Sequence, residues 1–561
     1  MEENNSYSRR QWLGKITVPA VAAGATMIGL EANASPTNDE KENKLAGAAI
    51  YNVRDHGAKG DGKTLDTAAI QSAIDKCFNE KGGTVLIPAG DFLSGTLELK
   101  SNVTLHIAAS GKLLGSPKRE DYTAGKGVPP GNGNIVFLYA VNADNISIEG
   151  KGTVDGNGLA FYNGKGDNTG PGQNGVGGNF DRPHLFIFFQ CNNLCLQNAF
   201  FKASAYHCVR ILKCKQVHID GIKIYNRVNR NNDGFHFNDC EYVHVMNCDV
   251  QCQDDACALF GSNKFVTITN CSFSTRWSIF RFGGGESQNI AVSNCLIYDT
   301  YGCPIKISAG RASIENFTFS NIIMRNVTGP IGIGFSGPSN NSTNDTQDAT
   351  KPFIRNIVFN AIRATVVAKP IDHPDIHFGV TVREGEKNSC ITLNAMGEYY
   401  LENISFTDVH VKYAGGGTAE QAGKVVPNEA AEYFGVWNQL PGGPPAYGMY
   451  ARNVKGLSLQ NVRFEYEESD ARPAIIFDNV QDASINGLSA KGNEATALLR
   501  FINSKDILLT GTRVLTPSTV FLLVEGPSSK DITVNGGDIQ KAKQSLVADK
   551  GALRTAVRMQ A

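Results

Sequence analysis

Two short acidic runs follow one another in this chain at a spacing that can bring their side chains together. Asn232-Asp233-Gly234 is followed by Gln253-Asp254-Asp255, so Asp233 and Asp254 lie 21 residues apart. Each run alone fits a turn, because Asn, Asp and Gly all favour turns. In a chain that coils with this period, however, residues in the same phase stack on adjacent coils. Three stacked aspartates can divide the acid and base roles that glycoside hydrolysis requires.

Basic and aromatic residues recur at nearly the same interval. His207 precedes Asp233 by about one coil and Arg276 follows Asp254 by about one coil, so we expect all four to line one groove. Arginine can bind a sugar carboxylate through two hydrogen bonds, and it lowers the pKa of nearby aspartates. The predicted substrate-binding residues are Arg276, Arg281, Lys306, His207, His236 and Trp277. The alternative is structural: cations that only neutralise carboxylates, histidines that only pack, and a tryptophan that only fills a turn.

The predicted acidic cluster has a clear electrostatic consequence. Carboxylates this close cannot all ionise freely, so the pKa of at least one should be raised. A raised pKa suits a general acid near neutral pH, while ionised neighbours activate water. A calcium site is the alternative interpretation, since calcium prefers oxygen ligands. We expect no cofactor and no bound metal.

Strand-like segments recur at intervals of a little over twenty residues and position these side chains. They include Val217-His218-Ile219, Val243-His244-Val245, Val266-Thr267-Ile268 and Ile290-Ala291-Val292. Parallel coils of this size indicate an all-β fold, a right-handed parallel β-helix. An amphipathic segment at Thr64 to Cys77 predicts a helix that caps its N-terminal end.

Cysteine and asparagine follow the same repeat. Cys248, Cys271 and Cys295 occupy the same phase of three successive repeats, which predicts an inward stack of free thiols rather than disulfides. Asn247, Asn270, Asn294 and Asn321 follow the same rhythm and predict a hydrogen-bonded ladder at one corner, inside the coil.

The predicted organisation has one folded domain. Residues 1–34 resemble a twin-arginine signal peptide, with Arg9-Arg10, an apolar stretch and Ala32-Asn33-Ala34 before the cleavage point. A flexible linker at 35–46 precedes the catalytic β-helix at 47–545, and 546–561 is predicted as a C-terminal tail. Insertions are predicted near 163–179, 366–399 and 414–447. We therefore expect a periplasmic or extracellular protein.

Composition narrows the range of partners. The 561-residue chain has a formal net charge of -1, which gives no global field toward nucleic acid or an anionic membrane. The apolar stretch of the signal is too short and glycine-rich for a membrane span. We expect a monomer that binds a polysaccharide or oligosaccharide.

Several motifs, in order, resemble glycoside hydrolase family 28, the polygalacturonases. They are the opening YNVRDHGAKGDG, Gly150 to Gly156, Arg182-Pro183-His184-Leu185, Asn232-Asp233-Gly234, Asp254-Asp255 and Pro445-Ala446-Tyr447-Gly448. The resemblance covers roughly 47 to 470 and implies a parallel β-helix. It also implies that Asp254 is the general acid, and that Asp233 and Asp255 direct a water molecule to invert the anomeric centre.

The chain departs from the family pattern at two positions. The family's Gly-His-Gly motif is replaced by a stretch that contains Arg276 and no histidine. Its Arg-Ile-Lys motif reads Pro304-Ile305-Lys306, so the lysine is kept and the arginine is not. These changes bear on the sugar that is recognised more than on the hydrolytic chemistry.

The sequence therefore predicts an exported glycoside hydrolase that cleaves an α-linked bond in a pectic polysaccharide, of polygalacturonan or rhamnogalacturonan type. Two alternatives remain. One is a calcium-dependent polysaccharide lyase on the same fold, and the other is a non-catalytic glycan-binding β-helix.

Overall fold

The structure is a computed structural model. It describes residues 49–131, 133–162, 181–309, 313–335, 352–369, 373, 388–426 and 443–560. The predicted signal peptide, the linker and the insertion at 163–179 lie outside these residues, as do parts of the other two insertions. Ala46–Ala561 forms one compact unit.

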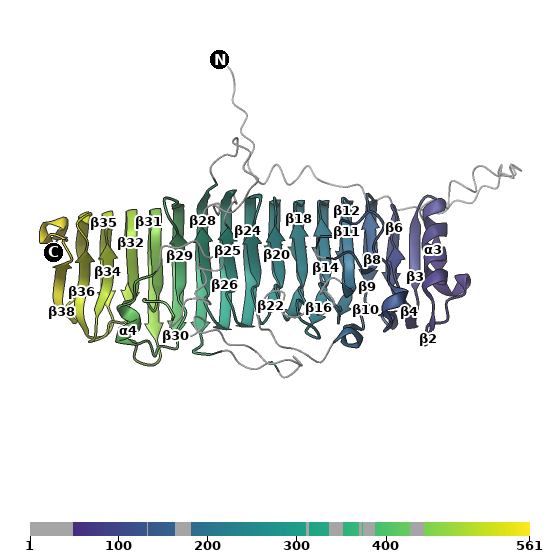
Figure 1. Cartoon of the computed structure of the whole chain (residues 1–561), viewed down its shortest axis with the longest axis horizontal. Helices are drawn as coiled ribbons and strands as arrows, with labels where there is room; N and C mark the ends of the chain where they lie inside the picture. The colour runs from purple at the N-terminus through teal and green to yellow at the C-terminus, as the bar shows by residue number, and fades with distance from the viewer. Residues whose placement is uncertain are drawn as a thin grey trace, which may run out of the picture. The chain divides into compact units, whose positions relative to one another are not determined.

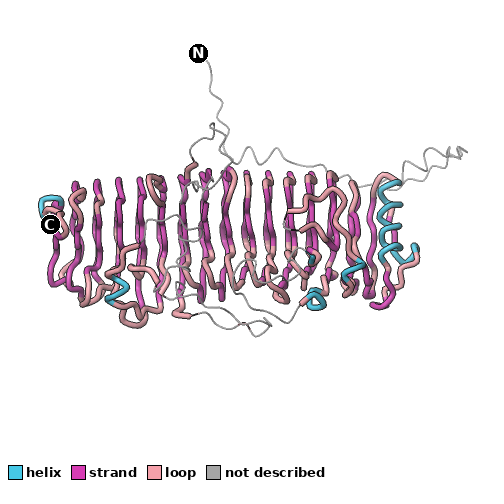
Figure 2. Tube along the Cα trace, viewed as in Figure 1, coloured by secondary structure: helices cyan, strands magenta, loops and turns pink. Residues whose placement is uncertain are grey.

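This unit is a right-handed parallel β-helix, as predicted (Figure 1, Figure 2). All strand pairings are parallel apart from one isolated antiparallel bridge, Ala124 with Ile135, among the described residues. Each coil contributes to three faces, and the strands of one face pair with those of the next coil. The buried residues of all three faces meet in one continuous apolar core.

The first face runs the length of the unit. Its strands are β1 (Ile50–Asn52), β3 (Gly83–Ile87), β6 (Val103–Ile107), β9 (Asp144–Gly150), β12 (Asn192–Gln197), β15 (Lys215–Asp220), β18 (Glu241–Met246), β21 (Lys264–Thr269), β24 (Glu286–Thr300), β26 (Ser313–Val327), β28 (Ile354–Val366), β30 (Leu401–Tyr413), β31 (Met449–Tyr466), β32 (Ile475–Asn486), β35 (Lys505–Val514), β37 (Lys530–Asp538) and β39 (Val557–Gln560).

The second face begins with short strands, which later merge into the long strands of the first face. These are β2 (Asp61–Leu65), β4 (Gly90–Ser94), β7 (Gly111–Gly115), β10 (Thr153–Asp155), β13 (Phe200–Lys202), β16 (Lys223–Asn226), β19 (Asp249–Cys252), β22 (Ser272–Ser274) and β33 (Ser489–Ala490).

The third face carries the candidate site. Its strands are β5 (Leu97–Glu98), β8 (Val136–Val141), β11 (His184–Phe189), β14 (Val209–Leu212), β17 (Phe235–Asn238), β20 (Cys257–Phe260), β23 (Phe280–Gly283), β25 (Ile305–Ala309), β27 (Ile331–Phe335), β29 (Ile391–Ala395), β34 (Ala497–Ile502), β36 (Ser518–Glu525) and β38 (Ala542–Asp549). The first residues of β31 and β32 join this face between β29 and β34.

Helices are few and short. The capping helix is α3 (Thr67–Asn79), at the N-terminal end of the solenoid (Figure 1), where Ile70, Ala73, Ile74 and Cys77 are buried. The predicted start at Thr64 was wrong, because Asp61–Leu65 forms β2 and pairs with β4. α4 (Ala419–Ala422) is a single turn within the insertion near 414–447. The 3-10 turns are η1 (Val53–His56), η2 (Arg119–Asp121), η3 (Gly158–Phe161) and η7 (Arg554–Ala556). In the described part of the chain, no helix is long and apolar enough to cross a membrane.

The β-helix continues beyond the boundary predicted at residue 545. β38 (Ala542–Asp549) pairs with β36, and β39 (Val557–Gln560) pairs with β37. The predicted tail at 546–561 was therefore wrong up to Gln560. Its polar residues belong to the last, outer strands, and such strands need fewer apolar side chains than a central coil.

The two side-chain stacks were predicted with different success. Cys248, Cys271 and Cys295 are buried, and all 13 cysteines are free thiols. The asparagine ladder forms in part, because Asn321 Nδ2 donates to Asn294 Oδ1 at 2.8 Å. It lies on the outside of the coil rather than inside, since these asparagines occupy left-handed turn positions whose side chains are exposed.

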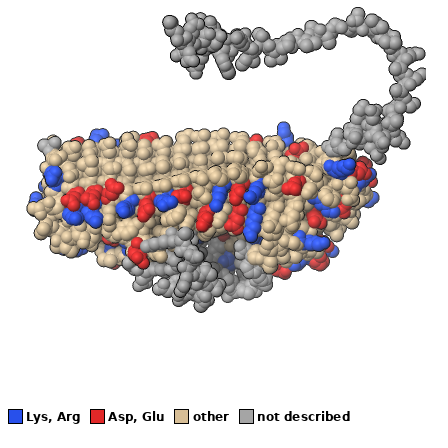
Figure 3. Space-filling view, turned by 90° about the horizontal axis from the view of Figure 1, so that it is seen from above, with Lys and Arg blue, Asp and Glu red and all other residues tan. Residues whose placement is uncertain are grey.

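Charges on the outside of the unit are mixed. Figure 3 shows Lys and Arg alternating with Asp and Glu in a band along one side of the solenoid. The alternation agrees with the formal net charge of -1. Any attraction for an anionic ligand must therefore be local.

Candidate active site

The three aspartates lie in stacked turns on adjacent coils. Asp233 is in the turn between β16 and β17, and Asp254 and Asp255 are in the turn between β19 and β20. β17 and β20 are register partners, with Phe235 opposite Cys257. Because the strands are in register, the turns that precede them are too, and the Gly234 amide donates to the Asp255 carbonyl at 2.9 Å.

Asn232 shapes the turn that presents Asp233. Its Oδ1 accepts from the amides of Val228 at 3.0 Å and Asn229 at 2.7 Å. Its Nδ2 donates to the carbonyls of Ser204 at 3.0 Å and Tyr206 at 2.7 Å. All four hydrogen-bonding positions of the fully buried amide are therefore used. Asn232 therefore stabilises the turn that contains Asp233.

Gly234 is required by space. A Cβ at this position would collide with the Ala256 carbonyl oxygen and would lie 2.9 Å from a methyl group of Val250. Any larger residue would push the Asp233 turn away from the next coil. The Asn-Asp-Gly run thus consists of a turn-shaping amide, a buried carboxylate and a glycine that permits close stacking.

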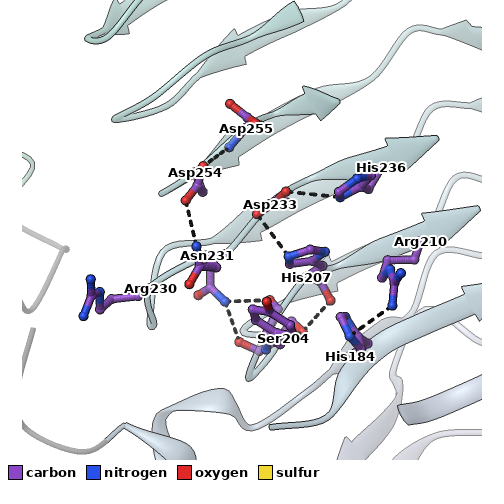
Figure 4. Close-up of polar contacts among 12 residues, drawn as sticks. His184, Ser204, His207, Arg210, Arg230, Asn231, Asp233, His236, Asp254 and Asp255 are labelled. Carbon is purple, nitrogen blue, oxygen red and sulfur yellow. Dashed lines mark hydrogen bonds and ion pairs between the residues drawn. The ribbon is translucent and has the colours of Figure 1, made fainter. Parts of the chain in front are cut away.

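The Asp233 carboxylate lies between two imidazoles (Figure 4). Its Oδ1 is 3.7 Å from His207 Nε2, and its Oδ2 is 3.3 Å from His236 Nδ1. All three side chains are buried. The two rings stack at 5.0 Å between centroids. The sequence predicted both histidines at this site, and the structure brings both against Asp233 rather than leaving them in the core.

Both imidazoles are held neutral. Burial lowers the pKa of His207 well below its usual value, and the nearby His236, His184 and Arg210 lower it further. Burial, reinforced by Arg210, lowers the pKa of His236 to about 3. Neutral imidazoles lie against Asp233 without adding a positive charge to the site.

Asp254 lies one coil beyond Asp233 and is held by different donors. Its Oδ1 accepts from the Asp255 amide at 2.9 Å, and its Oδ2 accepts from Asn231 Nδ2 at 3.3 Å (Figure 4). Thr275 Oγ1 donates to its backbone carbonyl. Asp255 Oδ1 is buried and has no hydrogen-bond partner among the described residues.

The carboxylates interact strongly. Burial raises the pKa of Asp233 well above its usual value, and the charge of Asp255 raises it further. Burial likewise raises the pKa of Asp254, with added repulsion from Asp233 and Asp255. Asp233 and Asp254 therefore compete for protons, and protonation of one favours ionisation of the other. A site of this kind can hold one acid and one base together near neutral pH.

Two of the predicted cations, Arg281 and Lys306, lie on neighbouring strands of the third face. Arg281 on β23 and Lys306 on β25 are register partners, in the same outward row as His236. Arg281 lies over the Phe260 ring at 5.7 Å. Lys306 is fully buried, lies 5.0 Å from the centroid of the Trp277 ring and lowers the pKa of Asp254.

Arg276 is buried and contacts Tyr301. Its Nη1 donates to the Tyr301 carbonyl at 2.9 Å, and its guanidinium lies 5.8 Å from the centre of the Tyr301 ring. Trp277, which follows it, is half-buried, and its ring contacts Lys306. The contacts of Trp277 favour packing against a cation over stacking on a sugar.

Two site cations were absent from the sequence prediction. Arg210 and Arg182 are the cations that lower the pKa of Asp233. Arg182 lies 4.7 Å over the Tyr206 ring, and its Nη1 donates to the carbonyls of Ala205 and Arg230, both at 2.9 Å. A signal for Arg210 was present, since it precedes His236 by the same interval that separates His207 from Asp233.

His207, Asp233 and His236 form the one set of potential metal ligands found in the described residues. Their candidate ligand atoms all lie within 4.8 Å of one another. Two imidazoles and one carboxylate suit zinc-like ions, whereas calcium takes six to eight oxygen ligands. This set contains only Asp233 of the three aspartates for which the calcium site was considered.

The sequence of this chain is similar to those of known proteins. The family described as Glycosyl hydrolases family 28 matches residues 77–373. A probable polygalacturonase of Arabidopsis thaliana is 26% identical over 391 residues, covering 65% of this chain and 83% of that protein. An exopolygalacturonase of Zea mays is 25% identical over 400 residues, covering 68% and 87%.

A solved structure supports the architecture. The tailspike protein of E. coli bacteriophage HK620, in complex with a pentasaccharide, is similar with a TM-score of 0.51. It is 12% identical, and the match covers 92% of this chain and 81% of that one, which shows the fold alone. The family match extends over more than half of the chain and includes both acidic turns. This chain belongs to family 28 of the glycosyl hydrolases and is a glycoside hydrolase.

Proposed function

We propose that this chain is exported and hydrolyses an α-linked glycosidic bond in a pectic polysaccharide, of polygalacturonan or rhamnogalacturonan type, with inversion. Its family and the polygalacturonases it resembles support the substrate class. The observation that carries the reaction is the stacking, on adjacent coils, of Asp254, whose pKa is raised, and Asp233, which lies against two imidazoles.

Asp254 is the general acid in this proposal. Its carboxyl group stays protonated because burial and two neighbouring aspartates oppose its ionisation. It gives its proton to the glycosidic oxygen as the bond to the anomeric carbon breaks, so the leaving sugar departs as an alcohol. Lys306 opposes this effect and keeps the pKa from rising further.

Asp233 and Asp255 direct the water in this proposal. When Asp254 holds the proton, repulsion on Asp233 falls and its carboxylate can ionise. His207 and His236 lie against it, and Arg210 and Arg182 stabilise its charge. The water loses a proton to this pair as its oxygen bonds to the anomeric carbon from the side opposite the leaving group. That direction of attack inverts the anomeric configuration.

Product analysis on pectic oligosaccharides tests the proposal. Hydrolysis should release new reducing ends with no ultraviolet absorbance from an unsaturated sugar, in the absence of added calcium. NMR of the first products should show the anomer opposite to the substrate linkage. An unsaturated product formed only with calcium would establish a lyase instead, and binding without turnover would establish a glycan-binding β-helix.

A further inference from the structure

Part of the third face is covered by apolar contacts rather than open to solvent. On the strands that precede the site, Tyr139 of β8, Ile187 of β11 and Leu212 of β14 point outward, opposite to the core-facing residues of the same strands. Together with Val128 and Val136 they form a second buried apolar cluster, separate from the core. Outward positions on a solvent-exposed sheet are normally polar, so this cluster indicates a permanent cover.

The cover is segment 123–134, of which residues 123–131, 133 and 134 are described; these follow the second face and pack across the third. The bridge between Ala124 and Ile135 closes its base, and the Gly125 amide donates to the Asn134 carbonyl at 2.8 Å. Val128 belongs to the apolar cluster. A Cβ at Gly125 would lie 3.2 Å from the Tyr139 ring, so the segment packs directly on the strand.

Arg210 fastens this segment at the edge nearest the carboxylates. Its Nη1 donates to the Gly133 carbonyl at 2.8 Å, and its Nη2 donates to the Gly131 carbonyl at 3.2 Å. Arg210 is the register partner of His236, which lies against Asp233. The covered area therefore ends one coil before the catalytic carboxylate, a separation of about 4.8 Å.

We propose that segment 123–134 blocks the substrate path on the N-terminal side of the carboxylates, so that the enzyme releases short products from a chain end. A polymer laid along the third face would meet the segment within about one coil of Asp233. Room on that side is then limited to a short terminal unit, and an internal bond cannot reach Asp254 with polymer extending in both directions. This inference rests on the proposed hydrolase function and adds the mode of action.

The wild-type enzyme tests the inference first. The pectic polymer that it degrades best is incubated, and viscosity, reducing ends and product sizes are followed together. We expect the smallest oligosaccharides to dominate from the earliest time points, with viscosity falling slowly. Early release of a series of intermediate lengths would overturn the inference while leaving the hydrolase function intact. A folded protein that cleaves no pectic polymer or oligosaccharide would overturn both.

Two variants test the segment itself. Ala124 and Ile135 are bridge partners, so a Gly-Ser turn can replace 125–134. The substitution Val128→Asp, which places a charge in the apolar cluster, loosens the segment without shortening the chain. Val358→Asp on β28 makes the same change at a partly exposed outward position and is the control.

The variants should change the products. We expect viscosity to halve at a several-fold smaller fraction of cleaved bonds in both segment variants, with intermediate oligosaccharides appearing early. Val358→Asp should keep the wild-type profile. If the shortened enzyme does not fold, Val128→Asp decides the matter. A folded, active Val128→Asp enzyme whose segment is cut faster by protease, yet whose products match wild type, would overturn the inference.

Discussion

Arg210 on β14 and His236 on β17 are register partners in one outward row, and each serves the same carboxylate. His236 lies 3.3 Å from Asp233, and Arg210 lowers the pKa of Asp233 while its guanidinium binds two carbonyls of segment 123–134. One side chain thus both binds segment 123–134 and lowers the pKa of Asp233.

Asp254→Asn should reduce turnover by about 10²–10⁴-fold with the fold intact. The amide keeps the shape and the acceptor for the Asp255 amide, but it cannot donate the proton that the leaving oxygen needs. The rate on a pectic oligosaccharide, with matched circular dichroism, checks this. Asp239→Asn is a matched control, because the Asp239 side chain also accepts a hydrogen bond from a backbone amide, that of Ser262. Near-normal turnover by folded Asp254→Asn would exclude Asp254 as the acid.

The acidic cluster could be predicted from sequence because one coil period separates its members. The register of β17 and β20 then stacks Asp233 and Asp254 on adjacent coils. This stacking could be predicted without knowing where the side chains point. The cations were harder to predict. Arg182 lies just before β11 and donates to the carbonyls of Ala205 and Arg230. Both carbonyls belong to irregular turns, whose conformation the sequence repeat does not predict.

Lys306→Met should move the alkaline limb of the kcat profile to higher pH. Lys306 lowers the pKa of Asp254, so its removal raises that pKa, and the acid stays protonated over a wider range. Methionine retains the length needed to pack against Trp277. Lys455→Met, at an exposed position on β31, is the control. If the alkaline limb of the kcat profile stays at the wild-type pH, Lys306 does not lower the pKa of Asp254 during turnover.

Asp254→Asn should also raise the melting temperature at neutral pH. The pKa of Asp254 is raised in the folded state, so the folded state binds the proton more tightly than the unfolded state. Ionisation therefore destabilises the native protein as pH rises above about 4, and the amide removes this cost. The difference from wild type should vanish below about pH 4, where both states are protonated. Melting curves from pH 3 to 8 measure it, and equal melting temperatures across that range would contradict it.

Arg472→Met should destabilise the C-terminal coils by about 3–5 kcal/mol, because it leaves Asp470 as a buried charge without its partner. Arg472 Nη2 lies 2.7 Å from Asp470 Oδ2, and both side chains are almost fully buried. Its Nη1 also donates to the carbonyls of Asn388, Pro444 and Ala446, which lie within the two insertions predicted near 366–399 and 414–447. Urea unfolding measures the loss. Arg513→Met, on the outward side of β35, should change stability little, and an equal loss there would show that the buried pair has no special role.

Plain polygalacturonate should be a poorer substrate than pectin fragments that are branched or contain rhamnose. Arg276 stands where the family has a histidine, and its Nη1 donates to the Tyr301 carbonyl at 2.9 Å. Pro304 stands where the family has an arginine, and it has no cation to offer to a uronate. Recognition of successive carboxylates should therefore be weakened on this side of the site, while Asp233 and Asp254 keep their geometry. A comparison of kcat/KM on defined oligosaccharides of each type measures the preference.

A Pro304→Arg variant should improve the rate on polygalacturonate more than on rhamnose-containing fragments. Equal wild-type rates on both classes would show that these two replacements do not set specificity.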